Sequence, residues 1–255
     1  MNIAAVLLGV ALLVIIATAG LATTAAVRGT RINGAVRPLE RWSRSVAGAM
    51  GATAILLAIP AIGDRLNAAT HVDNLSMLLA HLFGIACLTS LRVLLVTWTY
   101  PPSAREAALR LRFATAGAFT VAATIAFAMA DRSGIAFINA DAQDGGVGTY
   151  LMITDSYWVL AGAMIARDCI PLAIDNARSG HRTIAVGQAL LAAGGAASAL
   201  WGATEAAYVA LTHMVGGAWS LGVQDAVSSS LAALYGICLF AGIAASAMRP
   251  AVTRQ

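Results

Sequence analysis

Hydrophobic residues in this chain gather into seven long runs that short polar segments separate. The runs cover residues 3–27, 45–63, 75–98, 113–130, 149–171, 183–212 and 219–248. At about 1.5 Å per residue, each is about long enough for a helix to cross a hydrocarbon core of roughly 30 Å. The runs are too long and too evenly apolar for barrel strands. The pattern therefore predicts an all-α membrane protein, a single domain built as a seven-transmembrane-helix bundle.

Arginine residues collect in every second connection between these runs. They are Arg28, Arg31, Arg37, Arg41, Arg44, Arg105, Arg110, Arg112, Arg178, Arg182, Arg249 and Arg254. The alternate connections carry mostly aspartate, for example Asp64, Asp73 and Asp141. Positively charged connections stay in the cytoplasm, so we expect the N-terminus outside and the C-terminus in the cytoplasm.

Two prolines lie inside the predicted helices. We expect Pro60 to kink the second helix near its outer end, and Pro171 to kink or end the fifth near the cytoplasm. The connections at 28–44 and 131–148 are the longest, and we expect loops there.

The composition supports a membrane protein and argues against a nucleic-acid partner. The chain is 59% hydrophobic and 11% charged, whereas a soluble domain carries about 25% charged residues. The formal charge of +4 reflects the arginine bias of one side. The basic connections lack interleaved aromatic residues, so we expect a lipid bilayer as their partner and no nucleic acid.

Ionisable residues lie at similar depth in four of the predicted helices, about one to two turns below their outer ends. They are His81, Asp155, Glu205 and Asp225. Charged groups are costly in lipid and usually face the interior of a helix bundle. Their common depth predicts an outward-facing polar site among the third, fifth, sixth and seventh helices.

Aromatic residues share this level of the predicted bundle. Trp201, Glu205 and Tyr208 are spaced i, i+4, i+7 and so lie on one helix face, and Trp158 follows Asp155 by three residues. Acidic and aromatic side chains together hold organic cations. The candidate ligand-binding residues are therefore His81, Asp155, Trp158, Trp201, Glu205, Tyr208 and Asp225.

Three other interpretations of the same residues remain open. His81, Asp155, Glu205 and Asp225 could ligate zinc or another divalent metal, although no H-E-x-x-H motif supports this. Buried acids could instead take up and release protons as the protein moves. The acids could also simply bond to tyrosine, serine or threonine and fix the helix packing.

A second polar group lies toward the inner side. Arg92 lies on the face of the third helix that carries His81, and Arg167 and Asp168 lie near the inner end of the fifth helix. Two opposite charges in lipid cost less together than apart. We therefore expect a structural ion pair between Arg92 and Asp168, with Arg167 reaching toward the headgroups.

All sixteen basic residues are arginine, and the chain has no lysine. A seven-helix bundle with its N-terminus outside invites comparison with retinal proteins, but those need a lysine for the Schiff base. We therefore expect no retinal, and no cofactor other than the divalent metal considered above. No G-x-S-x-G, P-loop or Cys-x-x-Cys motif indicates an enzyme.

The segments Asp64-Arg65-Leu66 and Asp73-Asn74-Leu75, followed by His81, accompany the seven-helix layout. In these features the chain resembles a family of actinobacterial seven-helix membrane proteins generally labelled putative transporters. The resemblance implies a multi-pass protein of the bacterial plasma membrane. Longer members of that family continue into a cytoplasmic domain, which we do not expect here.

These observations predict a receptor-like protein that binds a small cationic ligand or ion. It would pass its occupancy to a cytoplasmic protein partner through the arginine-rich loops. The alternatives are a small transporter of a cation or protonated solute, and an intramembrane metal-dependent hydrolase. A receptor binds without flux, a transporter responds to an ion or pH gradient, and a metal-dependent enzyme loses activity to a chelator.

Overall fold

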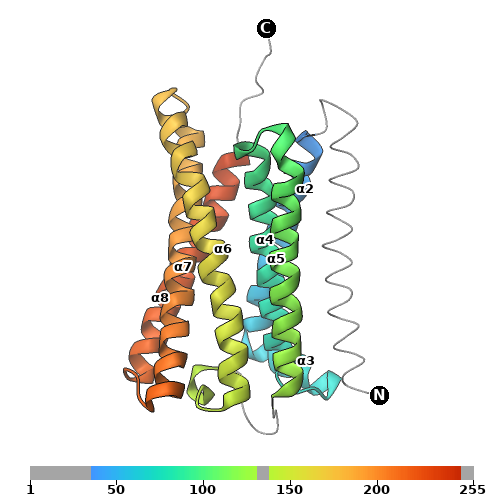
Figure 1. Cartoon of the computed structure of the whole chain (residues 1–255), viewed down its shortest axis with the longest axis vertical. Coiled ribbons are helices and arrows are strands. Elements are labelled where there is room, and N and C mark those ends of the chain that lie inside the picture. Colours follow the sequence, from blue (N-terminus) through green and yellow to red (C-terminus); the bar gives the residue numbers. More distant parts are fainter. Residues whose placement is uncertain (1–35, 131–137, 248–255) are drawn as a thin grey trace.

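The computed structural model describes residues 36–130 and 138–247, and all its regular elements there are helices (Figure 1). They are α2 (Val36–Ala58), α3 (Pro60–Thr70), α4 (Leu75–Thr99), α5 (Pro102–Met129), the 3₁₀ helix η1 (Asn139–Asp141), α6 (Gly145–Arg178), α7 (Arg182–Val215) and α8 (Leu221–Ala247). Within the described ranges five helices, α4 to α8, are long and apolar enough to cross a membrane, or up to six if α2 and α3 form one span. The all-α membrane class is confirmed. The run at 3–27 lies outside the described residues, so the seven-span count stays a prediction.

The long helices stand side by side and alternate in direction (Figure 1). One end of the bundle holds the start of α2 and the connections between α4 and α5 and between α6 and α7; we call it the arginine-rich end. The other end holds α3, η1 and the connection between α7 and α8; we call it the η1 end.

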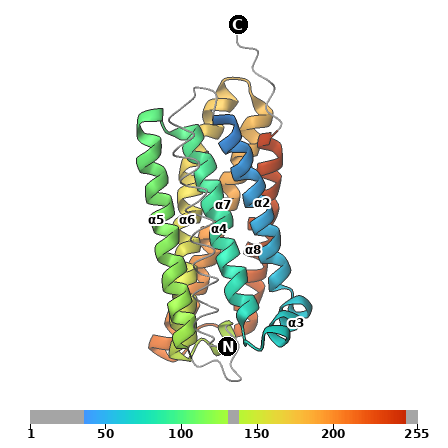
Figure 2. The ribbon, with the colours of Figure 1, turned by 90° about the vertical axis from the view of Figure 1, so that its right-hand side faces the viewer.

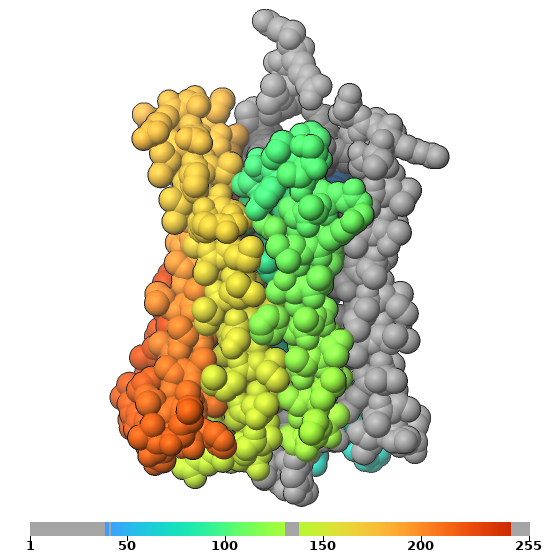
Figure 3. All heavy atoms as spheres, viewed as in Figure 1, coloured from blue at the N-terminus to red at the C-terminus, as the bar shows by residue number. Residues whose placement is uncertain are grey.

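The described helices form two groups. α7 packs on both α6 and α8, α2 packs on α4, and α4, α5 and α6 contact one another more loosely (Figures 1 and 2). Figure 3 shows α5 and α6 side by side on the face that it draws. α4 is the most buried of the candidate spans, as its nearly uniform apolar surface requires.

Glycine residues allow α6 and α7 to approach each other closely. A Cβ added at Gly162 would lie 2.5 Å from the carbonyl oxygen of Gly195, and one added at Gly195 would lie 2.7 Å from that of Gly162. Nearer the η1 end, a Cβ at Gly202 would lie 2.7 Å from the carbonyl oxygen of Asp155. Small residues drive packing in lipid because they bring backbones together. This contact fixes the position of Asp155 relative to α7.

Pro60 breaks the second predicted run, as expected. α2 ends at Ala58, and α3 begins at Pro60 with its axis turned by 83°. Proline suits the first turn of a helix, where its missing N–H donor would have no partner anyway. Pro171 does not end its helix, because α6 continues through it to Arg178; the kink expected as the alternative stays a prediction.

Three helices extend further toward the arginine-rich end than the hydrophobic runs predict. α2 begins at Val36, inside the predicted loop 28–44, α5 begins at Pro102 instead of residue 113, and α6 ends at Arg178 instead of residue 171. Residues 102–112 are rich in alanine, arginine and leucine, which favour helix even where they are polar. Glu106 also pairs with Arg110 one turn later, at 2.5 Å.

Candidate functional site

The carboxylate of Glu205 lies inside the bundle, about ten residues from the η1 end of α7, and its residue is 9% exposed. The indole N–H of Trp201 donates to its Oε1 at 3.1 Å. The Ser228 hydroxyl on α8 donates to the same oxygen, and the Asn139 amide of η1 donates to Oε2. Glu205 therefore receives three neutral donors from three separate elements.

A chain of hydrogen bonds on α8 orients the Ser228 hydroxyl. The Gln224 amide donates to Ser228 Oγ at 3.2 Å, and Trp219 Nε1 donates to Gln224 Oε1 at 2.9 Å. A hydroxyl that accepts a bond from Gln224 has its own hydrogen free to donate to Glu205. Tyr208 lies beside this chain, its ring 5.7 Å from that of Trp219.

Asp155 on α6 is a second buried acid within electrostatic reach of Glu205. It is 6% exposed, and its Oδ2 atom is buried without a hydrogen-bond partner among the described residues. All four ion pairs in the described part of the chain lie elsewhere, toward the arginine-rich end. Two buried carboxyl groups within electrostatic reach of each other need a proton or a cation to offset the cost of their charge. We call Asp155 and Glu205 the acid pair.

Three aromatic rings from three helices pack beside the acid pair. The ring of Trp158 lies 5.3 Å from that of Trp201 and 5.9 Å from that of Tyr235, and the last two are 6.1 Å apart. Rings at these separations are in contact, so no ligand fits between them. Trp201 belongs to both features, since its N–H bonds Glu205 while its ring contacts the other two.

The structure brings four of the seven predicted ligand residues together, namely Asp155, Trp158, Trp201 and Glu205. Tyr208 lies at the edge of this site, against Trp219. The other two point elsewhere. His81 Nδ1 lies 2.6 Å from the Tyr150 hydroxyl, linking α4 to α6, and Asp225 is exposed on α8.

Asn139, Gln224, Ser228 and Tyr235 were not among the predicted site residues. Gln224, Ser228 and Tyr235 are spaced i, i+4, i+11, so they share one face of α8. That spacing could have indicated a polar face of α8 turned toward the site. Asn139 lies outside every hydrophobic run, and the sequence carried no signal for it.

A metal site at the predicted residues finds no support in the described geometry. No group of three or more His, Cys, Asp or Glu residues is arranged to hold a metal ion in the part of the chain that the structure describes. His81 and Asp225, two of the four candidates, do not bond to the acid pair. The intramembrane hydrolase considered from the sequence therefore lacks an assembled centre among these residues.

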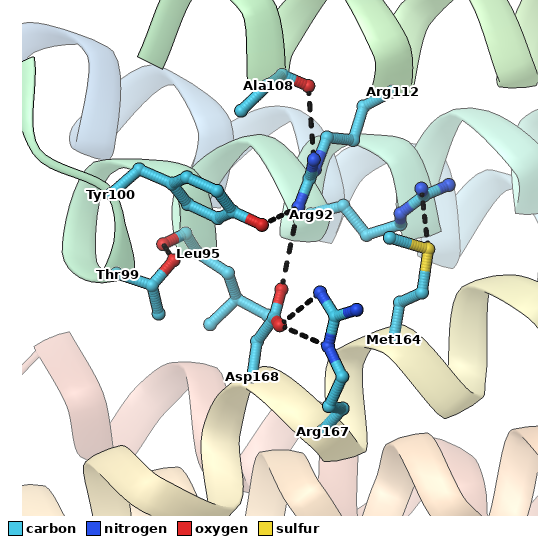
Figure 4. Close-up of polar contacts among 9 residues, drawn as sticks. All are labelled: Arg92, Leu95, Thr99, Tyr100, Ala108, Arg112, Met164, Arg167 and Asp168. Atoms are coloured by element: carbon cyan, nitrogen blue, oxygen red, sulfur yellow. Dashed lines mark hydrogen bonds and ion pairs between the residues drawn. The ribbon is translucent and has the colours of Figure 1, made fainter. Parts of the chain in front are cut away.

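The expected ion pair between Arg92 and Asp168 is not formed. Asp168 pairs with Arg167 at 2.7 Å and with Arg112 at 3.7 Å, whereas Arg92 donates to the sulfur of Met164 at 3.0 Å (Figure 4). The reason is the early start of α5. Because that helix begins at Pro102, Arg112 lies inside the bundle, where it reaches Asp168.

No protein-family model, curated protein or solved structure matches the chain with significance. The fold defines an all-helical membrane protein with a buried acidic and aromatic site between α6, α7 and α8. The resemblance to actinobacterial putative transporters stays a prediction from the sequence.

Proposed function

We propose that this is a multi-pass plasma-membrane protein that binds a small cation at the acid pair and acts as a receptor. One observation carries the proposal: the buried Oδ2 of Asp155, beside Glu205, has no donor among the described residues. A bound cation would supply both the missing donor and the missing positive charge.

The chemistry of the site suits a small ammonium group or a monovalent ion. An N–H group of the ligand would donate to Asp155, and Trp158 and Trp201 would offer their ring faces to the charge. The three donors on Glu205 are neutral, so they orient its lone pairs without cancelling its charge. Because the rings already touch, the ligand must be small.

Access to the site is proposed from the η1 end, which the positive-inside rule makes extracellular. Asn139 covers Glu205 from that end and would have to move for a ligand to enter. α6 runs without a break from Asp155 to Asp168. It would carry a change in occupancy to the arginine-rich end, where a cytoplasmic protein partner would respond.

Thermal unfolding of the purified full chain in detergent tests the binding site, with methylammonium and sodium as probes at constant ionic strength. A ligand at a hundred times its Kd stabilises the folded state by about 2.7 kcal/mol. We expect one probe to stabilise the wild type, and we expect Asp155→Asn and Glu205→Gln to lose that effect. Asp73→Asn is the matched control, because that acid is exposed at the same end of the bundle. An unshifted wild type, or a full response in Glu205→Gln, would contradict the proposal.

A transporter of a cation or protonated solute is the second candidate, and the division of the bundle favours it. The acid pair belongs to the group α6–α8, whose α6 packs directly but less extensively on α4 and α5. Two such groups can move against each other around a site. Uptake of methylammonium into proteoliposomes, driven by a pH gradient, would support transport. Binding without flux would support the receptor.

A further inference from the structure

Buried arginine side chains gather between α4, α5 and α6 at the arginine-rich end (Figure 4). Arg92 and Arg112 are each 2% exposed, and they lie beside Arg167 and Asp168 of α6. We call these four residues the arginine cluster. It is separate from the acid pair, which lies toward the other end of the bundle.

The hydrogen bonds of the arginine cluster are incomplete. Arg112 donates to the Ala108 carbonyl at 3.2 Å and to the Tyr100 hydroxyl at 3.0 Å, but its Nε has no partner among the described residues. Arg92 donates to the sulfur of Met164, a weak acceptor, and lies beside the Tyr157 hydroxyl, while its Nε and Nη1 have no well-formed hydrogen bond among the described residues. Buried guanidinium donors without acceptors are costly, so the site as described lacks an acceptor.

The charge of the arginine cluster is also unbalanced. The cluster holds three guanidinium groups and one carboxylate: Arg112 and Arg167 pair with Asp168, whereas Arg92 turns toward Met164. Arginine stays protonated in proteins, so Arg92 cannot lose its charge on burial. The Tyr157 hydroxyl beside Arg92 already bonds the Thr89 hydroxyl at 2.6 Å.

Among the described residues, no other acid is placed to restore the balance. Glu40 and Glu106 each pair with the arginine one turn after them, and Asp175 is exposed. Residues 1–35 and 248–255 contain no aspartate or glutamate. Within the part of the chain that the structure describes, the positive charge of the arginine cluster is therefore not fully compensated.

We propose that the arginine cluster binds a phosphate group. Guanidinium forks match phosphate oxygens in pairs, and a phosphate carries about one to two negative charges with several acceptor oxygens. Those acceptors would meet the free Nε and Nη1 of Arg92 and the free Nε of Arg112. Arg167, whose side chain is 61% exposed, marks where the cluster opens to the surface.

Two sources share this chemistry, an anionic phospholipid headgroup and a soluble phosphate. The 34 residues of α6 span about 51 Å, roughly 20 Å more than a hydrocarbon core, so about 10 Å projects at each end. Asp168 lies ten residues before Arg178, the end of α6, or about 15 Å along the axis. That depth is close to the headgroup level, and both sources can reach it.

The test uses the full chain, purified and delipidated in detergent, in two arms. One arm compares inorganic phosphate with chloride at equal ionic strength. The other compares phosphatidylglycerol with phosphatidylcholine in mixed micelles, and native mass spectrometry counts the bound lipid. A rise in the melting temperature with phosphate assigns a soluble ligand, and a rise with phosphatidylglycerol alone assigns a headgroup. No rise in either arm would overturn the proposal.

Variants separate binding from a structural role. We expect Arg92→Gln to weaken binding of the active anion about tenfold, as loss of charge-assisted hydrogen bonds should. Arg110→Gln is the matched control, because that arginine lies near Arg112 on α5 but is exposed. Should Arg92→Gln fail to fold, Arg92→Lys keeps the charge, loses the fork and should bind more weakly than wild type. Unchanged affinity in the folded Arg92 variant would refute the site.

Asp168→Asn gives a readout that a purely structural cluster would not. It removes the anion that competes for Arg112 and Arg167, so we expect tighter phosphate binding, about threefold or more. Lower stability with the same or weaker anion response would argue against the site. Asp155→Asn should leave the anion response intact, so this test and that of the cation site fail independently.

Discussion

At the scale of single residues, the two buried acids of the acid pair differ in what surrounds them. Glu205 has donors from Trp201, Asn139 and Ser228, while the Oδ2 of Asp155 has none among the described residues. A carboxylate with several donors is held in one position, whereas an unsatisfied one leaves room for a ligand's donor. The carboxylate of Glu205 is thus held in one orientation, whereas the Oδ2 of Asp155 is free to accept a hydrogen bond from the proposed cation.

Removing one hydrogen-bond donor to Glu205 should leave its carboxylate less firmly oriented. We expect Ser228→Ala to destabilise the protein by about 1 kcal/mol, the usual value of a hydrogen bond inside a membrane bundle. It should also reduce stabilisation by the active cation. The matched control is Ser230→Ala, because the Ser230 hydroxyl is exposed and bonds only the Ala226 carbonyl of its own helix. Equal melting temperatures for the two variants would contradict the role given to Ser228.

The partner of Asp168 can be identified by coupling energies. We expect Arg112→Gln and Asp168→Asn to couple by about 1 kcal/mol in a double-mutant cycle of thermal stability. Arg92→Gln with Asp168→Asn should be close to additive, because Arg92 bonds Met164 and not Asp168. Strong coupling only in the Arg92 cycle would restore the pair that the sequence predicts.

At the scale of helices, the contact between α6 and α7 depends on two glycines that face each other. We expect Gly162→Ala to destabilise the protein by about 1–3 kcal/mol, since its Cβ would lie 2.5 Å from a backbone oxygen that cannot move alone. Gly117→Ala in α5 is the control, because a Cβ there has nothing within 4 Å. Thermal unfolding in detergent compares the two. Similar losses would mean that the close approach is not needed.

The sequence predicted the existence of these helices better than their ends. Long apolar runs located α4 and α8 almost to the residue, because hydrocarbon requires continuous apolar helix. Arginines predicted connections between helices. This prediction was wrong for α5, because Arg105, Arg110 and Arg112 lie in the helix, before the apolar run begins. The expected pair of Arg92 with Asp168 failed for the same reason.

The candidate site was predictable in depth but not in rotation. Counting residues from the helix ends put Asp155 and Glu205 at one level, and the structure brings them together. Adjacent helical residues differ by about 100° in direction, so α8 turns either Gln224 or Asp225 inward. Packing decides this: Gln224 is fully buried and Asp225 is exposed. A uniformly apolar helix such as α8 gives little periodicity from which to read its inner face.

At the scale of the whole molecule, polar contacts tie α6 to its neighbours at several levels. His81 meets Tyr150 near the η1 end, Thr89 meets Tyr157 at 2.6 Å further along, and Arg112 meets Asp168 near the arginine-rich end. Each joins α6 to α4 or α5, across the boundary between the two helix groups. These links are where a movement of one group would have to break and reform bonds, in a receptor or in a transporter.

The orientation of this assembly in the membrane is open to a direct test. We predict that the arginine-rich end is cytoplasmic, because arginine-rich segments border four alternate junctions of the hydrophobic pattern. Alkaline phosphatase, active only after export, would be fused after Gly217 or after Gln255. α8 is the only described helix between these points, so the two fusions should give opposite results whatever the first run does. Strong activity after Gly217 with none after Gln255 fits the prediction, and the reverse would invert the molecule. Inversion would place the arginine cluster outside and the acid pair toward the cytoplasm. The measurement therefore decides from which side of the membrane the proposed cation and the proposed phosphate would reach their sites.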